Sequence, residues 1–286
     1  MKLWEKKGSD INTQIEKFTV GRDPEFDMIL AIYDVQGSMA HAKMLESVNM
    51  LSTDEARSIQ KELENIESDI KNGLFSIETG VEDIHSQIEL NLTRKIGEAG
   101  KKIHSGRSRN DQIAVDIKLF LRAEILKIKA EVKELFDLLI SLSHQHRNDL
   151  LPGYTHFQIA MPSSFGLWFG AYAESLIDDL EILAASYQVV DKNPLGSGAG
   201  YGSSLPLNRK MTTELLGFNS LHYNVVYAQM SRGKTEKLVS FGLASIAATL
   251  SRLAMDCCLY MNQNFGFISF PDELTTGSST PGFSKL

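Results

Sequence analysis

The sequence is poor in cysteine and proline, and each shortage excludes a class of structure. Only two of the 286 residues are cysteines, Cys257 and Cys258; being adjacent, they cannot close the loops that staple small secreted domains. No proline lies between Pro24 and Pro152, which permits long helices because proline breaks them. The first seven residues form no apolar leader. The longest uncharged apolar-rich run, residues 238–251, is shorter than the roughly 20 residues that cross a membrane. We expect a soluble, cytoplasmic protein.

An excess of basic residues is also missing. The chain has 36 acidic and 29 basic residues, a formal charge of −7 at pH 7, and no block of like charges. Nucleic acids and anionic membranes are bound through clustered positive charge, so we expect neither as a partner. With 43% hydrophobic residues, the chain is long enough to bury a large core in one large domain or two ordinary ones.

Several short motifs of common enzymes are absent. The sequence contains no Gly-x-Ser-x-Gly, no His-Glu-x-x-His and no cluster of cysteine and histidine, so serine-hydrolase and zinc sites lack their local signatures. Residues 196–202 are rich in glycine but do not match the dinucleotide-binding fingerprint. We therefore expect no metal and no nucleotide cofactor.

Three stretches show the apolar spacing of long helices. Apolar residues alternate at intervals of four and three from residue 121 to 142 and again from 239 to 260, a period of 3.5 that places them on one helical seam. A similar stretch from 165 to 187 follows two serines that can cap a helix. The first helix is expected over about residues 111–146. Three long amphipathic helices favour a compact bundle over an extended coiled coil.

The first 110 residues show shorter helical patterns, over about 25–49, 52–72 and 83–97. No alternating pattern supports a substantial sheet. We predict an all-α protein with a smaller N-terminal helical domain at residues 1–110 and a central long-helix bundle at residues 111–286.

Four polar segments interrupt the helices and are the candidates for chemistry: residues 82–86, 104–112, 153–158 and 275–279. Each also has a structural interpretation, namely an acidic helix start, a solvated basic loop, a structural histidine and a linker. Residues 104–112 are the most suggestive, because they place two arginines, hydroxyls and an amide just before the longest helix. Guanidinium groups and free N–H groups at a helix start bind carboxylates, so a small di- or tricarboxylate is a natural ligand. In the third segment, His156 is suited to proton transfer near neutral pH.

Taken together, these segments closely resemble argininosuccinate lyases, a branch of the aspartase/fumarase superfamily. The resemblance covers nearly the whole chain. It is carried by Tyr-Asp-Val-Gln-Gly-Ser at residues 33–38, Asp-Ile-His at 83–85, Gly-Arg-Ser-Arg-Asn-Asp-Gln at 106–112, Gly-Tyr-Thr-His-x-Gln at 153–158, Pro-Leu-Gly-Ser-Gly-Ala at 194–199 and Gly-Ser-Ser at 277–279. The stretch at 106–112 is similar to the argininosuccinate branch rather than to fumarases, aspartases or adenylosuccinate lyases.

The resemblance implies a fumarase/aspartase-like bundle of long helices in a homotetramer, with each active site built from motifs of three subunits. It implies no cofactor. The implied reaction is the reversible β-elimination of argininosuccinate to arginine and fumarate, the last step of arginine biosynthesis. By motif position, Ser278 would remove the Cβ proton with support from His156. Ser108, Arg109, Asn110 and Thr155 would hold the succinyl carboxylates, and Asp83, His85 and Gln158 would line the site.

The sequence departs from the family after Ser279. The family's loop continues Gly-Ser-Ser-x-Met-Pro-x-Lys-x-Asn-Pro, whereas here Gly-Ser-Ser is followed by Thr-Pro-Gly-Phe-Ser-Lys-Leu at 280–286. The expectation is a chain truncated or altered within the catalytic loop, with an incomplete bundle and without the family's C-terminal domain. Two alternatives remain open: a non-catalytic, truncated or crystallin-like helical protein, and another lyase of the superfamily that acts on adenylosuccinate or aspartate.

Overall fold

The computed structural model describes residue 18 and residues 21–274. By spatial contacts the chain divides into two compact units. Unit 1 comprises Met1–Leu126 with Ser186–Leu238, and unit 2 comprises Lys127–Ala185 with Val239–Leu286. This division follows contacts rather than chain order and does not coincide with the boundary at residue 110 expected from the sequence, which stays a prediction.

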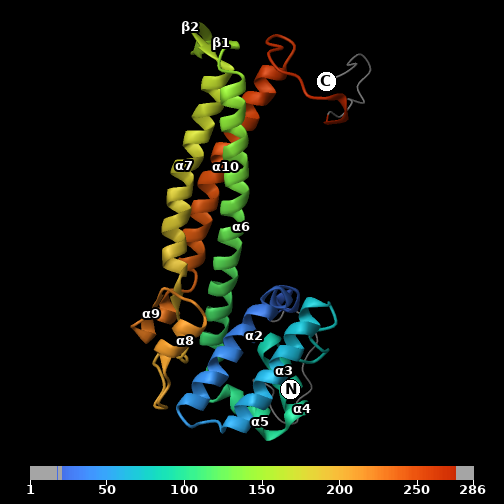
Figure 1. Ribbon diagram of the computed structural model, residues 1–286, viewed down its shortest axis with the longest axis vertical. Coiled ribbons are helices and arrows are strands. Elements are labelled where there is room, and N and C mark those ends of the chain that lie inside the picture. Colours follow the sequence, from blue (N-terminus) through green and yellow to red (C-terminus); the bar gives the residue numbers. More distant parts are fainter. Residues whose placement is uncertain (1–17, 19–20, 275–286) are drawn as a thin grey trace. The chain divides into compact units, whose positions relative to one another are not determined.

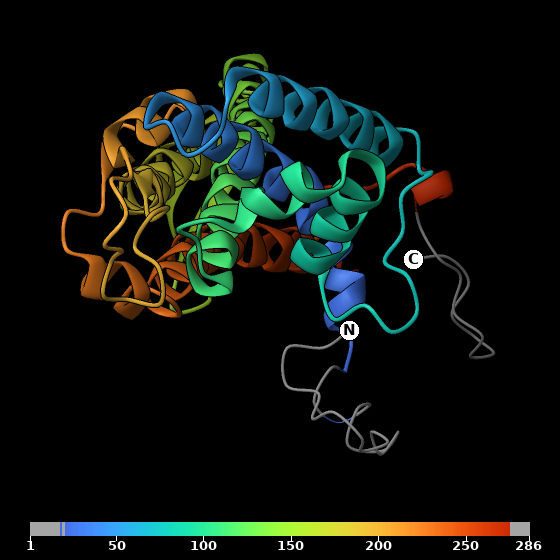
Figure 2. The ribbon, with the colours of Figure 1, turned by 90° about the horizontal axis from the view of Figure 1, so that it is seen from below.

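Unit 1 begins with a group of helices close to the predicted ones. They are α2 (Asp23–Ser47), α3 (Thr53–Lys71), α4 (Ile84–Ile96), the short α5 (Glu98–Lys101) and the 3-10 turn η1 (Lys102–His104). In Figure 2 these helices are blue to green, and α2, α3 and α4 contact one another pairwise. Their starts follow local capping rules: Ser52 and Glu55 form a reciprocal capping box on α3, and Asp83 caps α4 by accepting the Ser86 N–H.

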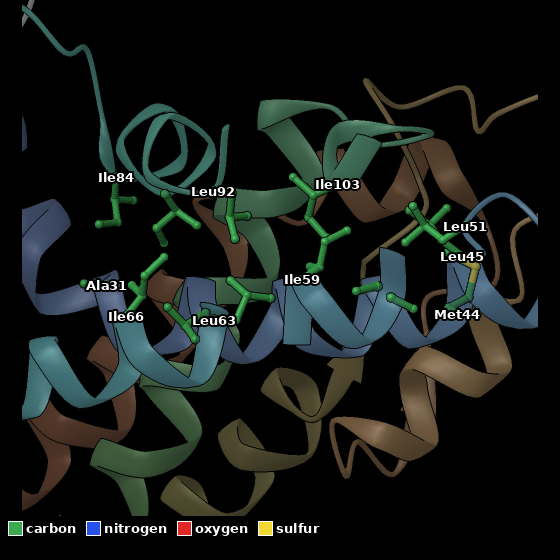
Figure 3. Packing of buried hydrophobic residues seen from close by; sticks show 14 of the residues in the cluster. Ala31, Met44, Leu45, Leu51, Ile59, Leu63, Ile66, Ile84, Leu92 and Ile103 are labelled. Atoms are coloured by element: carbon green, nitrogen blue, oxygen red, sulfur yellow. The ribbon is translucent and has the colours of Figure 1, made fainter. Parts of the chain in front are cut away.

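The core of these helices is aliphatic and tightly closed (Figure 3). Leu45 from α2, Ile59 and Leu63 from α3 and Leu92 from α4 are all fully buried, and Ile103 of η1 closes the cluster. Burying such side chains contributes about 1.5–3 kcal/mol each. This core holds the start of α4 and the segment after η1, which together carry two of the four candidate segments.

Unit 1 also contains the segment that follows α7. Its elements are β3 (Lys192–Asn193), α8 (Arg209–Leu215), β4 (Ser220–Leu221) and α9 (Val225–Met230). The two short strands pair in parallel. A small second core of Val115, Leu119, Leu195 and Phe218 joins this segment to the first turns of the long helix that starts at Arg109.

Unit 2 is built on three long helices that run side by side in Figure 1: α6 (Arg109–Gln145), α7 (Phe165–Val190) and α10 (Lys234–Met261). The 3-10 turn η2 (Asp272–Leu274) follows. At 37 residues, α6 is roughly 55 Å long. The three helices agree with the seams expected from the sequence, and the all-α fold class is confirmed. Along the α6 seam, buried and half-buried side chains alternate. Val132 and Leu139 are buried, and Leu135 and Leu142 are half-buried.

Helix α10 is, by length and composition alone, apolar enough to cross a membrane. Core helices of soluble proteins can be equally apolar; 22% of the most apolar stretch of α10 is buried, and the helix hydrogen-bonds to α7 through Asp256, Thr249 and Ser245. Both cysteines near its end are free thiols.

A two-stranded antiparallel hairpin was not expected from the sequence. It consists of β1 (Leu150–Thr155) and β2 (Gln158–Ser164). Its strands contain Pro152 and Pro162, which pair with each other, and proline normally argues against a strand. Both strands of an isolated hairpin are edges, where proline is tolerated. The turn residues His156 and Phe157 have φ of 51° and 58°, the left-handed conformation of a type I′ turn, without the Asn-Gly pair that usually predicts one.

Candidate functional site

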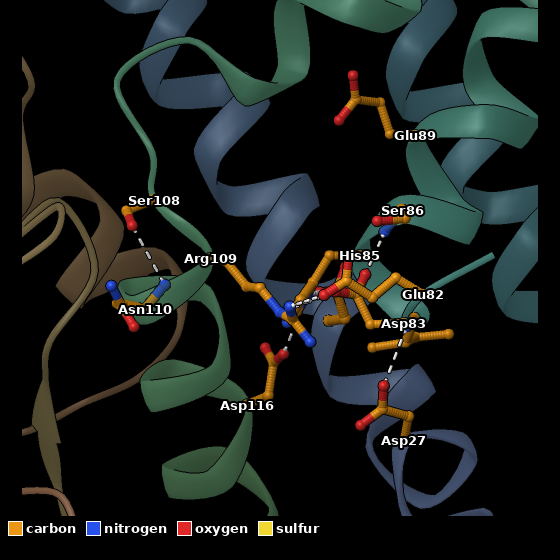
Figure 4. A network of polar contacts seen from close by, with 12 residues as sticks. Asp27, Glu82, Asp83, His85, Ser86, Glu89, Ser108, Arg109, Asn110 and Asp116 are labelled. Carbon is orange, nitrogen blue, oxygen red and sulfur yellow. Dashed lines mark hydrogen bonds and ion pairs between the residues drawn. The ribbon is translucent and has the colours of Figure 1, made fainter. Parts of the chain in front are cut away.

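Ser108 lies just before α6 and Asn110 in its first turn, and both present polar side chains with oriented donors (Figure 4). Ser108 Oγ accepts the backbone N–H of Asn110 at 3.3 Å. Asn110 Oδ1 accepts from Arg232 Nη1 at 3.2 Å, which fixes the orientation of the amide. The Ser108 O–H and the Asn110 Nδ2 hydrogens therefore remain to donate to a ligand. Asn110 is exposed and Ser108 is half-buried, so the loop can bind a carboxylate at the first turn of α6.

Arg109 is held against the start of α4. Its Nη1 donates to Glu82 Oε1 at 2.5 Å, and its Nε lies 2.8 Å from Asp83 Oδ2. Asp83 is buried and its other oxygen, Oδ1, accepts the Ser86 N–H at 2.7 Å. The guanidinium thus joins the 82–86 segment to the 104–112 segment. Much of its charge is compensated by these two carboxylates, and its direct contact with a substrate carboxylate stays a prediction.

His85 belongs to a buried network that the sequence did not indicate. Its Nδ1 hydrogen-bonds to Asp34 Oδ2 on α2 and lies 3.8 Å from Asp116 Oδ2 on α6. Asp34 Oδ1 accepts from Ser38 Oγ at 3.3 Å, and Ser38 in turn accepts from Arg107 Nη1 at 2.9 Å. Three parts of the chain that are distant in sequence, namely α2, the start of α4 and residues 107–116, therefore meet in one set of charges.

The electrostatics of this network follow from burial and opposite charge. Burial lowers the pKa of His85, but the Asp34 carboxylate outweighs it and leaves that pKa above its ordinary value. Burial would raise the pKa of Asp34, yet His85 and Arg107 hold it below its usual range. Burial and the Asp34 charge raise the pKa of Asp116 well above the ordinary value. The Asp34 carboxylate therefore faces both the His85 imidazole and the Arg107 guanidinium, while the raised pKa of Asp116 favours the neutral form of that carboxyl group.

The same residues are a candidate metal-binding group by geometry. One ligand atom each from Asp34, His85 and Asp116 lie within 4.8 Å of one another. The buried Arg107 guanidinium, which hydrogen-bonds to Ser38 beside Asp34, opposes a divalent cation at this position, however. The residues present fit an internal ion-pair network better than a metal centre, and the expected absence of a metal stays a prediction.

The predicted residues of the third segment lie at the tip of the hairpin in unit 2. Thr155 pairs with Gln158 in the ladder, and His156 occupies the first turn position. All three side chains are exposed. Unit 1 therefore brings together Ser108, Arg109, Asn110, Asp83 and His85, while Thr155, His156 and Gln158 are brought together in unit 2. Ser278 lies outside the described residues.

Asp111 makes contacts that extend beyond the start of α6. It is fully buried, and it accepts the N–H of Ser108 at 2.8 Å and those of Gly196 and Gly198 at 2.9 Å. The local part was detectable, because Ser-x-x-Asp at 108–111 is a capping-box signature. The glycine-rich partner is 85 residues away, and no local pattern predicts it.

Comparison with known proteins agrees with the motifs. Residues 15–281 match the lyase family. The chain is 60% identical over 278 residues to the argininosuccinate lyase of Phocaeicola vulgatus, covering 97% of this chain and 62% of that protein. It is 40% identical over 278 residues to the argininosuccinate lyase of Thermotoga neapolitana, covering 97% of this chain and 70% of that protein. The chain thus spans 62% of the length of the Phocaeicola relative.

Solved structures show the same architecture. An EDDS lyase variant with bound fumarate is 27% identical with a TM-score of 0.75, covering 83% of this chain and 47% of that one. A fumarate lyase:delta crystallin from Brucella melitensis, bound to cobalt, has 19% identity and a TM-score of 0.78, covering 96% of this chain and 66% of that one; this second likeness concerns the fold alone. The chain therefore belongs to the lyase family, in the argininosuccinate lyase branch of the aspartase/fumarase superfamily.

Proposed function

We propose that this chain catalyses the reversible β-elimination of argininosuccinate to arginine and fumarate. The observation that carries the proposal is the pair of donors on Ser108 and Asn110. Their acceptor atoms are engaged by the Asn110 N–H and by Arg232, so each presents hydrogens outward at a helix start. Membership of the argininosuccinate lyase branch supports this substrate over adenylosuccinate or aspartate.

The chemistry requires donors of this kind. A proton beside a carboxylate is weakly acidic, and its removal places additional negative charge on that carboxylate. Preorganised hydrogen-bond donors stabilise such charge without reorganising during the reaction. In the proposal, Ser108, Arg109, Asn110 and Thr155 hold the succinyl carboxylates, Ser278 takes the Cβ proton, and His156 supports it. Elimination then breaks the bond between the succinyl carbon and the guanidinium nitrogen, that nitrogen keeps the bonding electron pair, and arginine leaves as fumarate forms.

The proposal includes a homotetramer without a cofactor, located in the cytoplasm. It is supported by apolar side chains that unit 2 leaves exposed on its helices and hairpin, among them Leu138, Phe157, Ile177 and Met255. Exposed apolar groups in such number are typical of surfaces that other subunits cover. In the proposal, the hairpin and the loop before α6 contribute to active sites formed by different subunits.

The test is fumarate release from argininosuccinate, followed by ultraviolet absorbance. We expect the Ser278→Ala chain to lose at least a hundredfold in rate, since removal of a positioned base typically costs roughly 10²–10⁴-fold. Ser279→Ala is the matched control, because it removes the neighbouring hydroxyl and should retain activity. Adenylosuccinate and aspartate are assayed in parallel. Turnover of either in place of argininosuccinate would assign another superfamily lyase, and no turnover by a folded chain would favour the non-catalytic alternative.

A further inference from the structure

Asp111 occupies an unusual position for a helix-capping residue. It is the third residue of α6, and its Oδ1 accepts the N–H of Ser108, the residue before the helix. Its Oδ2 accepts two further backbone N–H groups, those of Gly196 and Gly198, each at 2.9 Å. One carboxylate therefore satisfies three backbone donors from two loops. Such a charge-assisted arrangement is stronger than ordinary caps.

The glycine-rich loop presents those donors in a backbone conformation that residues with side chains disfavour. Gly196 and Gly198 have φ of 82° and 60°, where side chains are disfavoured. A Cβ on Gly198 would lie 2.9 Å from the Gly202 carbonyl oxygen. The two N–H groups consequently converge on one point, and the Asp111 carboxylate fills that point.

The contacts continue from the glycine-rich loop back to the candidate site. Gln229 on α9 donates from Nε2 to Ser197 Oγ at 3.1 Å and to the Gly198 carbonyl at 3.3 Å. Arg232 follows α9 and donates to Asn110 Oδ1. Asp111 thus supports Ser108 directly, and it supports Asn110 by way of the loop, α9 and Arg232.

The contacts also explain why a carboxylate is required. Asparagine has the same shape but only one acceptor oxygen, so its amide group would face one or two of the three N–H donors. Burial raises the pKa of Asp111 above its ordinary value, and the backbone N–H groups of Ser108, Gly198 and Gly196, with the nearby Arg107 charge, oppose that rise. Loss of the charge therefore leaves buried donors unsatisfied rather than merely removing one bond.

We propose that Asp111 is a positioning residue for substrate binding, which joins the Ser108–Asn110 loop to the glycine-rich 196–198 loop so that both carboxylate-binding donors keep their orientation. This inference rests on the proposed function for its kinetic consequences. Asp111 itself touches no substrate. Its loss should weaken binding of a substrate carboxylate, such as that of argininosuccinate or succinate, more than it slows the bond-breaking step.

The kinetic experiment compares Asp111→Asn with the unmodified chain. We expect KM for argininosuccinate to rise about tenfold or more and kcat to change less. The reason is that an unsatisfied N–H group beside residue 111 would displace the Ser108 and Asn110 side chains. The matched control is Asp179→Asn on α7, a buried carboxylate that accepts from Ser245 and lies in unit 2. It also loses a buried charge, but KM should stay unchanged. A KM for Asp111→Asn equal to that of the unmodified chain would overturn the proposal.

Amide hydrogen exchange tests whether Asp111 holds the two loops together, and it does not depend on turnover. In Asp111→Asn, the peptides containing Ser108 and residues 196–198 should both exchange at least tenfold faster, whereas Asp179→Asn should leave both at the original rate. If the exchange rate at residues 196–198 stays unchanged in Asp111→Asn, Asp111 does not join the two loops, and this conclusion holds whether or not the variant releases fumarate. If the unmodified chain releases no fumarate, the proposed function fails, and this exchange measurement alone decides whether Asp111 joins the two loops.

Discussion

Replacing Asp34 by asparagine tests the buried network around His85 most directly. Asp34 and His85 are 3% and 7% exposed, so their charges are shielded from water. The substitution keeps the side-chain volume but removes the counter-charge that faces both the imidazole and, through Ser38, the Arg107 guanidinium. Breaking a buried ion pair from one side typically costs about 3–5 kcal/mol in the free energy of unfolding.

Asp116 determines where in that range the loss in free energy of unfolding falls. Its pKa is raised in part by the Asp34 charge, so without that charge Asp116 ionises more readily and partly replaces it. We therefore expect the lower end, about 3 kcal/mol, which corresponds to a fall in Tm of roughly 6–12 °C for a unit of this size.

The pH dependence has a defined sign. The folded-state pKa of His85 lies above its ordinary 6.5, so its stabilising contribution is fully present below pH 6.5 and is lost as the pH rises through the raised value. The Asp34 contribution is present above its ordinary pKa of 3.8 and is lost only as the pH falls through a lower value. The stability difference between the unmodified chain and Asp34→Asn should thus shrink as the pH rises above 6.5.

The assay is thermal unfolding followed by circular dichroism across pH 5–9 for both chains. Taking the difference between them removes the contributions of His41 and His222, whose lowered pKa values give the opposite pH dependence in both chains. A loss below about 0.5 kcal/mol, the usual range of surface substitutions, would refute the network. So would a difference that stays constant above pH 6.5.

Three further predictions concern the helices and the candidate metal group of unit 1. Leu92→Ala should destabilise the chain by about 3 kcal/mol because Leu92 is fully buried, whereas Leu74→Ala, at a side chain 75% exposed, should cost under about 0.5 kcal/mol; equal losses in urea unfolding would contradict the assigned core. Ser52→Ala should cost about 1 kcal/mol by removing the capping box of α3, measured in the same way. Because cationic groups oppose a metal at His85, neither chelator nor zinc should change Tm by more than about 1 °C, and a saturable rise with zinc would overturn this assignment.

The sequence predicted what depends on local pattern. The seams at 121–142 and 239–260 led directly to α6 and α10, and Ser52 and Asp83 lie at the helix starts that capping rules indicate. The hairpin escaped detection because its turn places His156 and Phe157, rather than glycine, in the left-handed region. Its strands also carry prolines, which are tolerated here because both strands of a two-stranded sheet are edge strands.

Only part of the candidate site could be predicted from local sequence pattern. The loop at 106–112 and the start of α4 were selected because polar residues accumulate there. The partners of those residues were not predictable in this way, because Asp34 and His85 are 51 residues apart and are joined by the packing of α2 against α4. Burial decides the charge of such groups, and burial follows from tertiary packing rather than from spacing along the chain.

The buried acids of unit 1 also limit which group can remove a proton from the substrate. Asp83 and Asp111 already accept backbone N–H groups, and Asp83 faces Arg109 as well. Asp34 and His85 are engaged with each other by a hydrogen bond. A general base must be unprotonated, reachable and free to accept. In the part of the chain that the structure describes, Asp83 and Asp111 therefore orient backbone and guanidinium donors, and the roles of Ser278 as base and of His156 as its support stay predictions.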